Sequence, residues 1–360
     1  DSTNEKVVIS YQDDGNSDYG TSIVGTVSGT SISFGTKVVF KSASIGRITS
    51  VFDSANNKVV VSYGEGVNGY SRVGTVSGTS ISFGTEVLIS TMTSSRITST
   101  FDSNSDKVVI CYREGSTGKS RVGTVSGTNI SFGTEATFES AEVDWISAGF
   151  DTVNNKVIIG YSDVGNSSFG TSVIGTVSGT NISFGTPVVF ESASSHNISV
   201  VYMPISGKVH ISYIDAGNSS YGTSNIGTVS GTSISFVGPV VFESAGSNNV
   251  SSVFDTLTNT VVIAYRATSN YGTSIVYEPT YIDTNVNITI GIATEAISDT
   301  ATGLITIIAG VNDQQSGLTI GTLYYVQYDG AITSSPDTNY DYKTLGRAIS
   351  VTEILIEKIE

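Results

Sequence analysis

The first part of the chain alternates short hydrophobic segments with polar turns. In the unit that runs from Arg47 to Ser90, four such segments follow one another: RITSVFD, NKVVVSY, YSRVGTVSGT and SISFGTEVLIS. Glycine, asparagine and serine residues separate them, and these residue types are typical of tight turns. Segments of this length, bounded by turns, predict four antiparallel β-strands in each unit.

The residues of each segment indicate its place in a sheet. The first segments (ITSVFD, ITSTFD, ISAGFD, ISVVYM and VSSVFD) are rich in small side chains, which suit a crowded innermost strand. The second segments (KVVVSY, KVVICY, KVIIGY and TVVIAY) are apolar on both faces, as in a strand packed between two sheets. In the last segment, Ile32 and Phe34 alternate with Ser33, which favours a half-exposed outer strand with a bulge or turn at its Gly-Thr.

One phrase, GTVSGTSISFGT, sets the period of the repeat. It begins at Gly25, Gly74, Gly123, Gly175 and Gly227, with spacings of 49, 49, 52 and 52 residues. The copies differ by Ser-to-Asn changes and by one late lapse to SISFVG. A period of about 40–50 residues that contains four strands is typical of β-propeller blades. We therefore predict an all-β fold in which residues 1–278 form a propeller.

The repeat also bears on the number of blades and on the domains. Second strands occur six times and SISF strands five times, so we expect about six blades, with five or seven as alternatives. Residues 1–8 match residues 53–60, so the chain starts in mid-blade. We expect either a fragment of a longer chain or a ring closed by strands from both ends.

From residue 279 the phrase is absent, and residues 279–360 predict a small C-terminal β-rich domain.

Charge narrows the classes of partner. Charged residues make up 14% of the chain, and its net charge is −15. An acidic surface repels phosphate backbones and anionic lipids, so we expect no nucleic-acid partner. No segment reaches the ~18 apolar residues of a membrane-spanning helix, so we expect no membrane insertion. Cys111 is the single cysteine and is expected to be a small buried apolar residue.

The loops between second and third strands carry candidate binding residues. DDGNSDYGTS, DVGNSSFGTS, DAGNSSYGTS and SNYGTS are versions of one loop. They place aromatic residues at Tyr19, Phe169, Tyr221 and Tyr271, and Tyr70 lies near the same place. Exposed aromatic side chains on one rim of a ring would stack on sugars or anchor a protein partner. The alternative is that they pack between neighbouring loops.

Trp145 is a further candidate. It stands just before an innermost strand, where other units carry residues such as arginine, and it is the only tryptophan in the chain. We expect it near the axial opening of the ring, as a hot spot for binding.

Acidic and imidazole side chains were weighed for metal binding and catalysis. A ring of carboxylates from the Phe-Asp pairs is one reading of Asp53, Asp102, Asp151 and Asp255. The preferred reading is that each aspartate accepts backbone N–H bonds in the following turn. The DDGNS-type loops have calcium ligation as an alternative to hairpin chemistry, but no cofactor or metal is expected. His196 and His210 have no second ligand at metal spacing.

The carboxylates do not indicate an enzyme. They repeat evenly from unit to unit instead of forming one unusual pair, and a glycosidase needs such a pair. We therefore predict a protein without catalytic activity.

The sequence resembles tandem-repeat structural and fibre proteins of tailed bacteriophages, particularly marine ones. The repeat unit VIGTVSGTNISFGTPVVFESA carries this resemblance, together with NITIGIA (287–293), NDQQSG (312–317), LTIGTLYYVQYDG (318–330) and LGRAISVTEILI (345–356). The resemblance covers almost the whole chain. It implies a virion-surface or tail-associated, and hence extracellular, protein that attaches to the host envelope, and it supplies no catalytic residues.

These observations predict a non-catalytic binding module that attaches a virion to a host-envelope glycan or protein. Linked, repeated sites can raise avidity by ~10²–10⁴. Specificity is expected where the copies differ, at 64–70, 113–119, 142–145, 194–197 and 266–271. The first alternative is a structural spacer or decoration domain that binds only other virion proteins. A bacterial cell-surface adhesin comes next, then a glycan-cleaving enzyme. Association into a homo-oligomer is left open.

Overall fold

The computed structural model divides the chain into two compact units, Asp1–Pro279 and Thr280–Glu360. The first unit is described for residues 1–91, 96–268 and 271–277, and the second for residues 291–293, 305–307, 311–312, 317–320, 322–327, 332–335, 342–348 and 354–356. Each unit is considered by itself.

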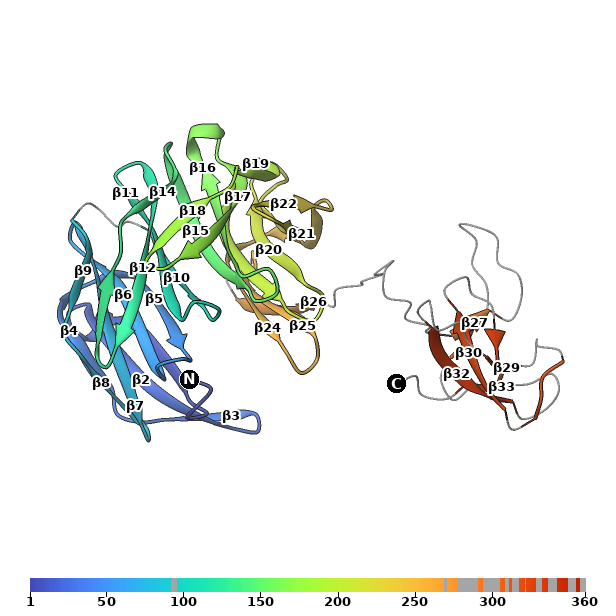
Figure 1. Ribbon diagram of the computed structural model, residues 1–360. Coiled ribbons are helices and arrows are strands. Elements are labelled where there is room, and N and C mark those ends of the chain that lie inside the picture. The colour runs from blue at the N-terminus through green and yellow to red at the C-terminus, as the bar shows by residue number, and fades with distance from the viewer. Residues whose placement is uncertain are drawn as a thin grey trace. The chain divides into compact units, whose positions relative to one another are not determined.

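The first unit is a β-propeller whose six blades follow one another along the chain (Figure 1). Its strands, blade by blade, are β1 (Val7–Asp13), β2 (Tyr19–Ser28), β3 (Ser31–Phe34) and β4 (Val38–Ser44); β5 (Gly46–Asp53), β6 (Lys58–Glu65), β7 (Asn68–Ser77), β8 (Ser80–Phe83) and β9 (Val87–Ser90); β10 (Ile97–Asp102), β11 (Lys107–Glu114), β12 (Thr117–Ser126), β13 (Asn129–Phe132) and β14 (Ala136–Glu139); β15 (Val143–Asp151), β16 (Lys156–Asp163), β17 (Phe169–Ser178), β18 (Asn181–Phe184) and β19 (Val188–Met203); β20 (Lys208–Asp215), β21 (Tyr221–Ser230), β22 (Ser233–Phe236) and β23 (Val240–Gly246); β24 (Asn248–Asp255), β25 (Thr260–Arg266) and β26 (Gly272–Tyr277). Two short 3-10 helices, η1 (Asp14–Asn16) and η2 (Val164–Asn166), lie in loops of blades 1 and 4.

A complete blade is an antiparallel sheet in the order predicted from the sequence. In blade 2 the order is β5-β6-β7-β8, and β9 also pairs with β7. The outer strand is thus split in two at Gly84, whose N–H donates to the Val73 carbonyl at 2.9 Å. The bulge or turn expected at the Gly-Thr of the phrase is therefore present. The long strand β19 serves two blades, because its first half is outermost in blade 4 and its second half is innermost in blade 5.

The innermost strands meet one another around the axis through small polar side chains. The Thr49 and Ser99 hydroxyls of neighbouring blades lie 3.0 Å apart. The Ser147 hydroxyl accepts the Val200 N–H at 3.0 Å, and the Ser199 hydroxyl accepts the Ser252 N–H at 2.9 Å. Small Ser and Thr residues therefore let adjacent backbones approach closely, which confirms the innermost placement of these strands.

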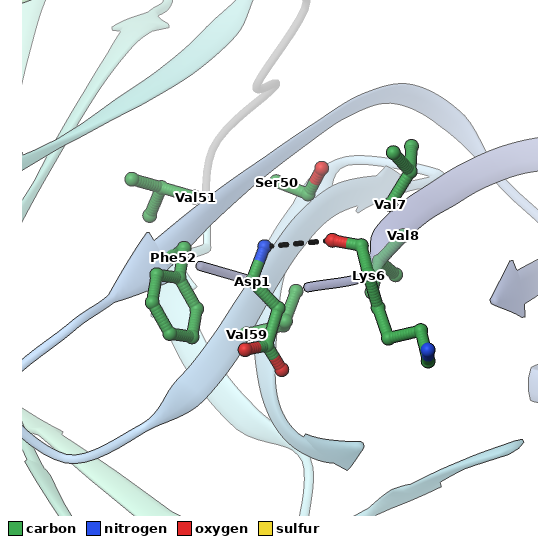
Figure 2. Close-up of a pocket in the computed structure, with 8 residues that line it drawn as sticks. All are labelled: Asp1, Lys6, Val7, Val8, Ser50, Val51, Phe52 and Val59. Atoms are coloured by element: carbon green, nitrogen blue, oxygen red, sulfur yellow. Dashed lines mark hydrogen bonds between the residues drawn. The ribbon is translucent and has the colours of Figure 1, made fainter. Parts of the chain in front are cut away.

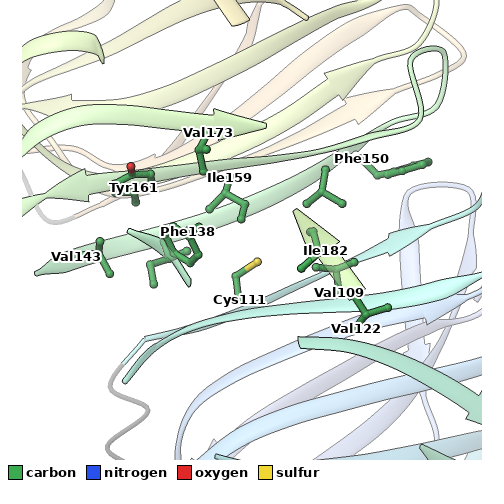
Figure 3. Close-up of a cluster of buried hydrophobic side chains, with 12 residues drawn as sticks. Val109, Cys111, Val122, Phe138, Val143, Phe150, Ile159, Tyr161, Val173 and Ile182 are labelled. Carbon is green, nitrogen blue, oxygen red and sulfur yellow. The ribbon is translucent and has the colours of Figure 1, made fainter. Parts of the chain in front are cut away.

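The second strands of blades 2 to 5 form the core, since each is sandwiched between two blades. Figure 3 shows one such layer, where Val109 and Cys111 of β11 face Ile159 and Tyr161 of β16. Cys111 is fully buried, as predicted, and burial raises the pKa of its thiol to about 12. Full burial of a branched aliphatic side chain contributes about 1.5–3 kcal/mol, so these layers are the main stabilising element of the ring.

The repeated phrase makes contact with itself across the blade interfaces. A Cβ on Gly84 would overlap the carbonyl oxygen of Thr128, so only glycine fits there. The contacting pairs are Gly35 with Thr79, Gly84 with Thr128, Gly133 with Thr180, and Gly185 with Thr232. Blade 5 carries Val237 in place of this glycine, and Val237 is 85% exposed. Blade 6 has no copy of the phrase that would contact Val237. Glycine is therefore not required at this position, which explains the change from SISFG to SISFV.

The turn interpretation of the Phe-Asp pairs is confirmed. Asp53 accepts the backbone and side-chain N–H groups of Asn56 at 3.0 and 2.9 Å. Asp151 does the same with Asn154, at 2.9 and 2.8 Å. Asp53, Asp102 and Asp151 are buried, so their carboxylates stabilise turns and do not form a ring that faces solvent.

The end blades are shorter than the others in the part of the chain that the structure describes. Strand β1 pairs with β2 alone, and β26 pairs with β25 alone.

The second unit is also β-rich, as predicted. Its strands are β27 (Gly291–Ala293), β28 (Ile305–Ile307), β29 (Val311–Asn312), β30 (Leu323–Gln327), β31 (Ile332–Thr333), β32 (Tyr342–Ala348) and β33 (Ile354–Ile356). They form a β27-β28 pair and a sheet in the order β29-β33-β32-β30-β31.

Candidate binding site at the axial mouth

In the described residues, four of the five innermost strands enter their blades through a β-bulge. The register shifts between Gly46 and Thr49 in β5, and the same shift recurs in β15, β19 and β24. The residue at each bulge lies six positions before the turn aspartate, or before Met203 in blade 5. These residues are Arg47, Trp145, Asn197 and Asn249, and Arg96 occupies the same repeat position in blade 3.

The bulge holds non-glycine residues in the left-handed backbone region. The φ angles are 49° for Arg47, 48° for Trp145, 49° for Asn197 and 52° for Asn249. Asparagine tolerates this conformation, whereas an arginine or a tryptophan costs of order 1 kcal/mol there. Such strain is typical of functional positions, where a particular side chain is retained despite the backbone it must adopt.

All of these residues except Asn249 border a cavity of about 230 Å³ at the mouth of the axis. Aliphatic residues, one position further along each strand, line it beside the bulge side chains. They are Ile48, Ile97, Ile146, Ile198 and Val250. Arg47, Arg96, Trp145 and Asn197 add donors and an aromatic ring. The cavity thus combines aliphatic side chains with several polar ones, so a ligand with both apolar faces and hydrogen-bonding groups would match it.

Contacts at this position join three pairs of consecutive blades in the described residues. The Arg96 guanidinium forms a two-pronged ion pair with Asp144, with Nη2 and Oδ2 3.0 Å apart. The next contact joins Trp145 and His196, whose ring centroids lie 6.3 Å apart. In the third, the Asn197 amide donates to Asn248 Oδ1 at 2.6 Å. In every case a bulge residue contacts the residue that precedes the bulge in the following blade.

Electrostatics distinguish Arg96 from Arg47. Arg96 lies over the Trp145 ring, 3.9 Å from its centroid. Burial alone would raise the pKa of Asp144, but the hydrogen bond and charge of Arg96 and the Trp145 N–H hold that pKa below its usual value. Burial, together with the charge of Arg96, lowers the pKa of Arg47. Arg47 has no salt-bridge partner among the described residues.

Trp145 lies at the axial mouth, where the sequence placed it, and its role in binding stays a prediction. Of its companions, Asn197 lies in the variable segment 194–197 where specificity is expected from the sequence, whereas Arg47 and Arg96 were missed. A signal was present, because the position six residues before the turn aspartate varies among Arg, Trp and Asn while its surroundings repeat.

The rim aromatic residues lie at the same end of the blades but outside this cavity. In blade 4, Val143, Asp163 and Phe169 occupy one row across three strands. Phe169 is therefore two strands, or roughly 10 Å, further from the axis than the start of the innermost strand. Tyr19, Tyr70, Phe169 and Tyr221 are half-buried, whereas Tyr271 is 74% exposed. Tyr70 packs against Tyr63 with centroids 6.2 Å apart. Binding by this rim stays a prediction.

The loops considered for calcium are built as turns. Asp163 Oδ1 accepts the Asn166 N–H at 3.1 Å, and Asp215 Oδ1 accepts the N–H groups of Gly217 and Asn218 at 2.9 and 3.1 Å. Over the described residues, no three His, Cys, Asp or Glu side chains gather as metal ligands would. The helices in this same part of the chain are too short to cross a bilayer.

A second cavity, of about 270 Å³, lies between β1 and β5 (Figure 2). It is lined by Val7, Val8, Val51, Phe52 and Val59 together with Asp1, Lys6 and Ser50. The Asp1 α-ammonium donates to the Lys6 carbonyl at 3.0 Å. The axial mouth differs from this cavity in offering two guanidinium groups, an amide and an indole ring.

No protein-family model and no curated protein matches the sequence. Solved structures do resemble the chain. One is a protein from Lactobacillus plantarum, with a TM-score of 0.56 at 10% identity over 99% of this chain and 97% of that one. Another is the BP39L lectin from Burkholderia pseudomallei, with a TM-score of 0.52 at 11% identity over 97% of this chain and 98% of that one. At these identities the likeness concerns the fold, and the predicted all-β propeller is confirmed.

Proposed function

We propose that this protein is a non-catalytic carbohydrate-binding propeller that serves host attachment at a virion surface. The axial cavity is the observation that carries the proposal. A sugar ring presents hydroxyl groups at its edge and C–H groups on its faces. Arg47 and Asn197 offer donors for the former, while Trp145 and the aliphatic wall suit the latter.

The size and the strain of the cavity support this reading. Sites for drug-sized ligands occupy roughly 300–1,000 Å³, so a cavity of about 230 Å³ suits one sugar residue at the end of a glycan. Arg47 and Trp145 are held at positive φ beside it. A purely structural bulge would be more stable with Gly or Asn at both positions.

The carboxylate beside the cavity supports binding without catalysis. Glycoside hydrolysis needs a carboxylic acid with a raised pKa and a second carboxylate. Asp144 is engaged by both prongs of Arg96, and its pKa is lowered. This arrangement suits a fixed acceptor or a positioning group better than a proton donor.

Two further lines support the setting of the proposal. BP39L, which shares the fold, is named a lectin, so a propeller of this kind is compatible with carbohydrate binding. The repeat and the C-terminal segments resemble fibre proteins of tailed phages, which favours a virion surface as the location.

The first experiment measures binding of the purified chain to intact bacterial cells and to glycans extracted from their envelopes. The Trp145→Asn variant tests the cavity, because asparagine keeps the bulge conformation seen at Asn197. We expect saturable binding that this variant weakens about tenfold or more. A second variant, in which Tyr19, Phe169, Tyr221 and Tyr271 are changed to Ala, tests the rim.

The outcomes separate the candidates. If the rim variant alone loses binding, the glycan site lies on the rim and the cavity is not used. If the folded wild-type protein binds no cell and no glycan, the proposed function is wrong. The structural-spacer alternative would then gain weight, because Val7 and Ile9 on β1 and Val276 on β26 are exposed at 39%, 40% and 55%, as surfaces for other virion proteins would be.

A further inference from the structure

The charges around the axial mouth are unequal, and the inequality is concentrated at Arg47. Five charged side chains interact in this region: Arg47, Arg96, Arg113, Glu142 and Asp144. Arg96 is paired with Asp144. Arg113 Nη1 is paired with Glu142 at 3.1 Å and donates to the Val143 carbonyl at 3.4 Å. Arg47 remains as the cation without a carboxylate among the residues that the structure describes.

The repeat explains why Arg47 is left over. The partner of each bulge residue is the residue before the bulge in the next blade, as in Arg96 with Asp144. For Arg47 that repeat position is Ser95, which has no charge and lies outside the described residues. Asp144 is the one carboxylate at this position in the five blades, and Arg96 already engages it at both oxygens.

An exposed arginine at the edge of such a cavity has a particular preference. Its planar guanidinium can donate two parallel hydrogen bonds to a carboxylate, and such charge-assisted bonds are about twice as strong as neutral ones. Arg47 lines the cavity together with Trp145 and Asn197. The chain as a whole has a net charge of −15, so this site is a local exception to an acidic surface.

Resting on the proposed carbohydrate function, we infer that the ligand at the axial mouth is an acidic saccharide whose carboxylate is held by Arg47. Trp145 then provides the surface on which the ring stacks. The aliphatic residues, such as Ile48 and Ile146, receive an apolar face or an acetyl substituent. Arg96 and Asp144 fix the tryptophan ring and its backbone, so they act as positioning residues.

The test uses the fluorescence of Trp145, which reports directly on the site because it is the only tryptophan in the chain. The full chain is titrated with pairs of sugars that differ in the carboxylate: galacturonic acid with galactose, glucuronic acid with glucose, and N-acetylneuraminic acid with its methyl ester. Sodium acetate at matched ionic strength serves as the plain carboxylate. Calorimetry on the same pairs gives a readout that is independent of the fluorophore.

The decisive variant is Arg47→Asn. Asparagine occupies the same bulge position in blades 5 and 6, so the variant is expected to fold, which its thermal unfolding will verify. The matched control is Lys37→Gln, which removes a cation 58% exposed on the blade edge, outside the cavity. We expect an acidic sugar to bind about tenfold or more tightly than its neutral partner. Arg47→Asn should abolish that preference, and Lys37→Gln should leave it unchanged.

Three results would overturn the inference. They are neutral sugars that bind at least as tightly as the acidic ones, acetate that saturates the site with the affinity of the acidic sugars, and an acidic preference that survives Arg47→Asn. Each of these leaves the proposed carbohydrate function standing if Trp145→Asn still abolishes binding to envelope glycans. Absence of binding to every sugar and to every envelope glycan would overturn both.

Discussion

Blades 2 and 3 differ from blades 4 to 6 in how one buried tyrosine is satisfied. The second strand of each ends in a tyrosine with a mostly buried ring. In blades 2 and 3, Tyr63 and Tyr112 donate to a glutamate of their own blade, Glu86 and Glu135. In the later blades the tyrosine reaches the outer strand of the preceding blade: Tyr161 donates to Glu139 at 3.2 Å, Tyr213 to Glu191 at 2.9 Å and Tyr265 to Glu243 at 2.9 Å.

The two arrangements have opposite electrostatics. Burial alone would raise the pKa of Glu86, but the bonds from Tyr63 and Lys41 outweigh it and hold the pKa below its usual value. Glu191 has no salt bridge in the described part of the chain. Its burial and the nearby charge of Asp215 raise its pKa, against the bond from Tyr213. Beside the buried tyrosine, the ionised form of Glu86 is thus favoured, whereas the ionised form of Glu191 is disfavoured.

The largest expected effect tests what the two regions share. Gly84→Ala in blade 2 and Gly185→Ala in blade 4 would each drive a methyl group into the carbonyl of the facing threonine. We expect both to lower the free energy of unfolding by about 3 kcal/mol, because backbone must move to relieve the overlap. Urea unfolding measures this. The exposed Val237→Gly is the control and should change stability by less than about 1 kcal/mol. If the two substitutions lowered the free energy of unfolding by different amounts, the two regions would also differ in backbone packing.

The next effect is confined to the interface between blades 5 and 6. His210 is fully buried where blades 2 and 3 have Val60 and Val109. Its ring lies 4.9 Å from that of Tyr277, and its Nε2 has no hydrogen-bond partner among the described residues. Burial lowers the pKa of His210 to about 4. The folded state therefore binds this proton only at a lower pH than the unfolded state does. The free energy of unfolding falls as the pH drops from the ordinary pKa of 6.5 towards 4.

The expected loss is roughly 3 kcal/mol over that window, from the difference between the two pKa values. Thermal unfolding of wild-type protein and His210→Val at pH 7 and pH 4.5 measures it. The variant should be at least as stable at pH 7 and should lose much less on acidification. An equal acid loss in the variant would contradict this account and would assign the loss to carboxylates alone.

The fold could be predicted from the sequence because the repeat shows the same strand pattern several times. The site could be predicted only in part, because it depends on local backbone geometry that the repeat pattern does not indicate. Strand order followed from small residues inside, apolar residues between blades and alternation outside, since each pattern answers to one environment. The mouth of the axis did not follow, because it depends on a bulge that turns Arg47 and Asn197 towards the cavity. A register shift of this kind has no hydrophobic period. Trp145 could be predicted because it replaces the residues that other units carry just before the innermost strand.

The smallest effect tests the opposite electrostatics directly. Glu86→Gln removes a favoured charge, so we expect it to lower the unfolding free energy at pH 7 by about 1 kcal/mol. The contribution of Glu86 is lost in the wild type as the pH falls through its lowered pKa, so the variant should approach wild type in acid.

Glu191→Gln keeps an acceptor for Tyr213 and removes a disfavoured charge. It should therefore be neutral or slightly stabilising at pH 7, and wild type should gain on it as Glu191 is protonated. Urea unfolding of both variants in the His210→Val background, at pH 7, at pH 4.5 for Glu191 and at about pH 3 for Glu86, separates these slopes from that of the histidine. If the unfolding free energies of the two glutamine variants changed with pH in the same way, the account would be wrong. The tyrosine, rather than the nearby cations, would then decide in both regions whether the glutamate is ionised.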